Sequence, residues 1–96
     1  MRREGERAVV SGSVTLSNAR ALLEEGREQL KAGVRTIDLG EVTELDSSLL
    51  AVLLAWQREA RAANVALVVE RLPQGLETIA RLYGVEALLS GSPAQH

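Results

Sequence analysis

Residues 37–56 read IDLGEVTELDSSLLAVLLAW, and this stretch decides the fold of the chain. It begins as a buried strand, continues as a short acidic loop through Glu41 and Glu44, and then enters a strongly apolar run. Ser and Asp side chains accept hydrogen bonds from the free backbone amides at helix N-termini. We therefore expect a helix to begin at Ser47 or Ser48.

The apolar run from Leu49 to Trp56 is compatible with either a buried strand or a helix. Residues 57–63 continue the pattern with good helix formers, so length favours one helix of about four turns. The run is much shorter than the roughly 20 apolar residues that a membrane span requires, and Asp46 and Arg58 bracket it. We expect a core helix and no insertion into a membrane.

Composition places the chain among small globular domains. It has 96 residues, of which 46% are hydrophobic and 25% charged. We expect one domain over residues 1–90 and a flexible polar tail over residues 91–96. Cysteine is absent, which excludes disulfides, thiolate nucleophiles and zinc-thiolate sites.

The net charge, the few aromatic residues and the N-terminal segment predict a cytoplasmic protein without a nucleic-acid partner. The formal net charge is −2, and the only aromatic residues are Trp56 and Tyr83, so neither a basic surface nor a stacking platform is predicted. The charged N-terminal segment lacks the apolar core of a signal peptide.

The remaining elements follow from hydrophobic periodicity and glycine positions. Gly26 lies on the apolar stripe of its helix and predicts close packing on a sheet. The continuous apolar run at residues 65–69 predicts a strand that helices cover on both faces. The expected elements are a weak first strand before Glu4, a strand over 7–16 broken at Gly12, a helix over 19–31 ended by Gly33, a strand over 34–39, the core helix to residue 63, a strand over 65–69, and a helix from Pro73 to Gly84 whose apolar face includes Leu76, Ile79, Ala80, Leu82 and Tyr83. This order predicts an α/β domain with a mixed, mainly parallel sheet packed against helices.

Acidic and hydroxyl side chains gather around the expected strand-to-helix turn, at the carboxyl edge of the sheet. They are Asp38, Glu41, Glu44, Asp46, Ser47 and Ser48. A hydroxyl beside free amides suits a phosphorylation switch or a docking contact. The structural alternative is that Ser47 or Ser48 only caps the helix, a contribution of typically ~1 kcal/mol.

Enzymatic readings have weaker support. A serine nucleophile requires a base, and the only histidine is His96, in the expected tail. The acids Glu41, Glu44 and Asp46 offer oxygen ligands for Mg²⁺, but their spacing is unspecific and a solvated acidic loop is the better interpretation. No phosphate-binding or dinucleotide-binding glycine motif is present. We therefore expect no enzyme activity, no metal and no cofactor.

The core helix is apolar on all sides between Leu49 and Trp56, which is more than one sheet-facing stripe requires. Either a partner protein or the flanking helices would cover the surplus, and the two interpretations have similar weight.

Residues 34–40, Val42 and residues 45–49 with the apolar helix resemble the STAS domain family. Three segments are similar to the MlaB type within that family: residues 10–15, residues 53–56 with 60–62, and Leu72-Pro73 with residues 79–85. Such a domain is a small subunit of the bacterial phospholipid ABC transporter that maintains outer-membrane lipid asymmetry. The Leu-Tyr-Gly segment favours this type over the anti-sigma factor antagonists that share the domain.

The resemblance implies that Ser47 is functional, as a contact with the transporter ATPase or as a phosphorylation site in an anti-sigma factor antagonist. Those antagonists usually have Gly where this chain has Leu49, and we expect the bulky side chain to change the surface that a kinase engages. The leading hypothesis is a non-enzymatic accessory subunit that binds and stabilises or regulates the ATPase, and through it the permease. It would be cytoplasmic and peripheral to the inner membrane, with self-association left open. The predicted partner-binding residues are Asp46, Ser47, Ser48, Leu49, Leu50 and Leu53.

Overall fold

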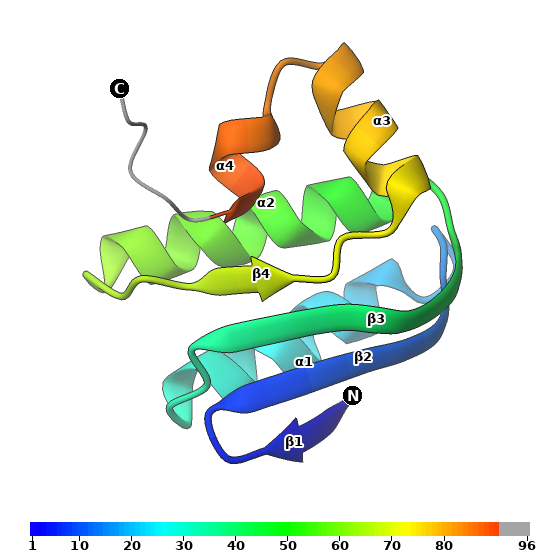
Figure 1. Cartoon of the computed structure of the whole chain (residues 1–96). Coiled ribbons are helices and arrows are strands. Elements are labelled where there is room, and N and C mark those ends of the chain that lie inside the picture. The colour runs from blue at the N-terminus through cyan, green and yellow to red at the C-terminus, as the bar shows by residue number, and fades with distance from the viewer. Residues whose placement is uncertain (91–96) are drawn as a thin grey trace.

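The structure, a computed structural model, describes residues 1–90 of the chain. Its elements, shown in Figure 1, are β1 (Arg2–Glu4), β2 (Arg7–Val14), α1 (Ala19–Lys31), β3 (Thr36–Leu45), α2 (Ser47–Ala62), β4 (Val68–Glu70), α3 (Gln74–Leu82) and α4 (Glu86–Ser90). The strands form one sheet in the order β1-β2-β3-β4, with β1 antiparallel to β2 and the other pairs parallel. This confirms the predicted α/β class and mixed sheet. The expected tail, residues 91–96, lies outside the described residues.

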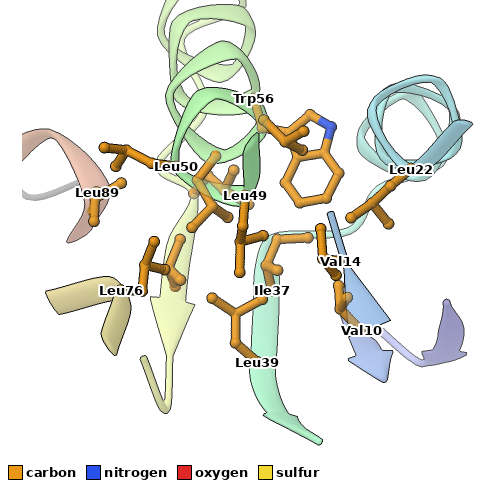
Figure 2. Close-up of a cluster of buried hydrophobic side chains, with 14 of the residues drawn as sticks. Val10, Val14, Leu22, Ile37, Leu39, Leu49, Leu50, Trp56, Leu76 and Leu89 are labelled. Atoms are coloured by element: carbon orange, nitrogen blue, oxygen red, sulfur yellow. The ribbon is translucent and has the colours of Figure 1, made fainter. Parts of the chain in front are cut away.

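The helices cover one face of the sheet. In Figure 2, α2 lies over the sheet with α1 on one side, and Leu76 of α3 and Leu89 of α4 lie on the other. Ala8, Val10, Ile37 and Leu39 of the central strands join the core beneath these helices. Side chains alternate between faces along a strand, so the residues between them face away from the helices. The prediction of a sheet covered on both faces was therefore wrong.

The segment over residues 65–69 shows why that prediction failed. The strand itself spans only Val68–Glu70, and Val68 is exposed. Val65 and Leu67 precede the strand and pack against the core from the connecting segment. The uninterrupted apolar run therefore includes two parts: a buried connecting segment and the start of a short strand with one open face.

Strand β3 is longer than predicted, and Glu41 and Glu44 lie within it rather than in a loop. Val9 and Ser11 are two residues apart on β2, whereas their partners Asp38 and Glu41 are three apart on β3. A second such shift occurs between Gly12 and Ser13. Each irregularity places an extra residue in β3, which interrupts the alternation expected of a strand.

Helix α2 is the centre of the core. Its Trp56 is 0% exposed, and its indole Nε1 donates to the carbonyl oxygen of Leu23 in α1 at 3.0 Å. The indole ring lies against Gly26, where an added Cβ atom would overlap the ring. Gly26 therefore permits close packing of α1 on α2, and not on the sheet as predicted.

The flanking helices cover the apolar surplus of α2. Leu50, Val52 and Leu53 are all buried, with α1 packed on one side of α2 and α3 and α4 on the other. In α3, Leu76 and Ala80 are buried as predicted. Leu82 and Tyr83, predicted on the same apolar face, are exposed. Leu82 lies two residues after the buried Ala80, which places it on the opposite side of the helix, and Tyr83 is the C-cap residue.

Asp38 is the third residue of β3, and its carboxylate is held on the open face of the sheet. The side chain is 3% exposed. Arg71 Nε and Nη2 donate to its two oxygens at 2.9 and 2.7 Å, and Arg7 Nη1 donates at 2.9 Å. Gly40 donates its amide at 2.8 Å and leaves room for the Arg71 guanidinium above it. This cluster fixes the connection from β4 to α3, where Arg71 adopts a φ of 55°.

We predict that Gly26→Ala lowers the free energy of unfolding by about 3 kcal/mol, because the new methyl group displaces the Trp56 ring. Urea unfolding followed by Trp56 fluorescence measures the change. Gly75→Ala in α3 is the matched control, since its Cβ meets nothing within 4 Å. Equal stability of the two variants would show that the indole does not require this glycine.

The Asp38 cluster predicts an acid-dependent loss of stability. Hydrogen bonds from Arg71 outweigh burial and, with the Gly40 amide, lower the pKa of Asp38 from 3.8 to about 2. Because the pKa is lower in the folded state, the contribution is present above pH ~4 and is lost as the pH falls toward 2. We expect the native protein to lose about 2 kcal/mol more than Asp38→Asn over this range in denaturant titrations. Parallel losses in the two proteins would contradict this assignment.

Candidate interaction site at the start of α2

Asp46 organises the turn between β3 and α2. Its Oδ1 accepts from the amide of Ser48 at 2.8 Å, and its Oδ2 accepts from the amide of Leu16 at 3.0 Å. Its own amide donates to the carbonyl oxygen of Val14 at 3.2 Å. One carboxylate therefore caps α2 and holds the connection between β2 and α1 beside it. The amide and hydroxyl of Ser48 and the amide of Leu16 lower the pKa of Asp46.

Asp46, and not either serine, is the N-cap of α2. Ser47 and Ser48 are the first two residues of the helix, which corrects the interpretation that one of them only caps it. Ser47 is exposed, and its hydroxyl bonds to no residue that the structure describes. The hydroxyl is thus available at a helix N-terminus whose backbone a neighbouring carboxylate holds in place.

Three predicted contact residues are in the core. Leu49 and Leu53 are 0% exposed and Leu50 is 5% exposed; Figure 2 shows Leu49 and Leu50 among the buried side chains. A surface partner does not reach these side chains in the folded domain, so their assignment as direct contacts is corrected. The burial of Leu49 also removes the expectation that it changes a kinase-facing surface.

The acids predicted to gather at the turn are dispersed along β3. Asp38 belongs to the arginine cluster on the open face, Glu41 pairs with Arg2 at 3.1 Å, and Glu44 accepts from the Ser13 hydroxyl at 2.9 Å. Arg2 lowers the pKa of Glu41. Within residues 1–90, no group of three or more acidic or histidine side chains is arranged to hold a metal ion. Of the six predicted acidic and hydroxyl residues, the structure brings together Asp46, Ser47 and Ser48.

The exposed face of α2 carries no charge near this turn. Ser47 and Ala51 are exposed, and the first charged residue of the helix is Arg58. Leu16 lies beside the turn and is 80% exposed. The sequence analysis missed Leu16 because its position after Val14 and Thr15 assigned it to a strand. The polar Ser17-Asn18 pair that follows was the nearest indication that the strand had already ended.

No helix within residues 1–90 combines the length and the apolar character needed to cross a membrane.

We predict that Asp46→Ala lowers the free energy of unfolding by about 1 kcal/mol, as expected for loss of an N-cap. Hydrogen exchange should accelerate at both the Ser48 and Leu16 amides, because one carboxylate holds them. Asp46→Asn is the matched control, since its single carbonyl oxygen retains one acceptor. Faster exchange at Ser48 alone in Asp46→Ala would show that Asp46 does not anchor the connection between β2 and α1.

Comparison with known proteins agrees with this architecture. No curated protein matches the chain. A protein-family model described as Mlab, STAS domain matches residues 2–90. This range includes all the strands of the sheet and the helices packed on it. The chain therefore belongs to the MlaB-type STAS domain family.

Proposed function

We propose that this protein is a non-enzymatic accessory subunit of a phospholipid-transporting ABC system. It binds the cytoplasmic ATPase, stabilises or regulates it, and associates through it with the permease at the inner membrane. The observation that carries the proposal is the free, exposed hydroxyl of Ser47 on the capped turn of an MlaB-type STAS domain. The contact surface is the exposed part of the first helical turns, with Asp46 holding the backbone that presents it.

The surroundings of Ser47 favour docking over catalysis. A serine nucleophile requires a base that accepts its proton. The adjacent carboxylate of Asp46 already accepts from two backbone amides, and these bonds lower its pKa. A carboxylate with a lowered pKa is a poor general base at neutral pH. His96 lies outside the described residues.

The shape and chemistry of the exposed face also support a protein partner. Ser47 and Ala51 have small side chains, so a partner can approach the helix backbone closely. Along α2 the first charged residue is Arg58, so a contact over Ser47 and Ala51 buries no ionised side chain of this helix.

A second candidate is an anti-sigma factor antagonist that a kinase switches by phosphorylating Ser47. The position of the exposed hydroxyl at a helix N-terminus favours this alternative, because the helix dipole and free amides stabilise a phosphate there. The neighbouring carboxylate of Asp46 would oppose the added charge.

We predict that Ser47→Glu weakens binding of the ATPase by about tenfold or more, because the contact would bury an unpaired carboxylate. The measurement is affinity capture from a lysate of the source organism, with mass spectrometry, followed by binding to the recovered ATPase. The helix N-terminus tolerates an acid, so the variant should remain folded. Ser11→Glu, at an exposed serine of β2, is the matched control.

Two outcomes would reject the proposal. One is full recovery of the ATPase by a folded Ser47→Glu variant, which would place the contact elsewhere. The other is recovery by the native chain of a histidine-kinase-like ATP-binding protein that phosphorylates Ser47, which would establish the second candidate.

A further inference from the structure

Leu16 projects into solvent from a connection that hydrogen bonds hold in place. The Asn18 side chain accepts from the amide of Thr15 at 2.9 Å and donates to the carbonyl oxygen of Ser13 at 2.7 Å. The amide of Leu16 donates to Asp46. An apolar side chain that is 80% exposed on a fixed backbone can be buried by a partner at little cost in loop ordering.

An apolar groove lies beside Leu16, between the first turns of α1 and α2. Its volume is about 210 Å³, and Ala19, Leu23, Ala51 and Val52 line it with Leu16. The small side chains of Ala19 and Ala51 leave this space between the helices. A cavity of about 150 Å³ is enough to hold benzene, so the groove has room for one leucine or phenylalanine side chain.

Arg20 gives the groove a charge preference. It lines the groove, and its guanidinium has no hydrogen bond or ion pair with any part of the chain that the structure describes. No acidic residue lines the groove. A partner carboxylate at the rim would therefore find an unpaired cation, and arginine binds carboxylates with two parallel hydrogen bonds.

We infer that the partner ATPase inserts one apolar side chain into this groove and places an adjacent carboxylate on Arg20. The inference rests on the proposed function and names the chemistry of its contact. Ser48 lines the groove, so the groove continues directly from the Asp46-Ser47-Ser48 turn. A single partner surface can then cover Ser47 and Leu16 together. Leu16 is an apolar anchor at one edge, and the ion pair with Arg20 fixes how the partner is positioned along the groove.

The test uses the full chain and the ATPase that it recovers. Leu16→Ser and Arg20→Glu should each weaken binding about tenfold. Ala51→Leu, which fills the groove, should weaken it similarly. The matched controls are Arg61→Glu, at an exposed arginine of α2, and Ala63→Leu, which fills the separate groove at the other ends of α1 and α2. They should bind as the native chain does. Unchanged thermal unfolding midpoints would show that the variants remain folded.

A photocrosslinking residue at position 16 identifies the occupant. The expected product joins Leu16's position to an ATPase peptide in which an apolar residue neighbours Asp or Glu. Changing that acid to Lys should restore binding of Arg20→Glu.

The outcomes separate this inference from the proposed function. If Ser47→Glu loses the ATPase while Leu16→Ser and Arg20→Glu retain it, the function stands and the groove contact is rejected. A crosslink to a second copy of this chain, or to a peptide without an acid, also rejects the groove contact. If the native chain recovers no ABC ATPase, the proposed function itself fails.

Discussion

The packing of Trp56 against Gly26 sets the distance between α1 and α2, on which the rest of the structure depends. The absent side chain at Gly26 admits the indole ring, and the Leu23 carbonyl oxygen accepts its N–H group. With the two helices fixed in this way, α2 covers the centre of the sheet. The width of the groove at their N-terminal ends follows from the same distance, since Ala19 and Ala51 do not fill it.

Two aspartates then tie distant segments to this core, and both oxygens of each carboxylate accept hydrogen bonds. Asp38 holds Arg7 and Arg71 on the open face of the sheet, and Asp46 holds the start of α2 and the connection to α1. Asp38 and Asp46 therefore have fewer free acceptor sites for a ligand than an unbonded carboxylate has. The groups left available near α2 are a neutral hydroxyl, a leucine and an unpaired arginine, which suit recognition of a protein.

The sequence predicted those parts of the fold where local and tertiary requirements agree. The bounds of α1 follow from its apolar stripe and from Gly33, which has a φ of 107°. The predicted strand ended at residue 39, before the true end of β3, because two extra residues break the alternating pattern around Glu41 and Glu44. The site was half predicted: Asp46, Ser47 and Ser48 follow from N-capping preferences, whereas periodicity does not tell which sides of the apolar α2 the neighbours cover. Leu49, Leu50 and Leu53 were therefore assigned to a partner although they form the core.

Helix α2 serves both the core and the surface because its residue sizes differ between its faces. Large side chains such as Trp56 and Leu53 point inward, whereas Ser47 and Ala51 leave the outer face of the first turns shallow and uncharged. A shallow apolar face gives little specificity by itself, because many proteins can cover it. Specificity in the proposed complex must then come from the edge of that face. Leu16 and Arg20 occupy that edge, and the carboxylate that caps the helix also fixes the backbone of Leu16.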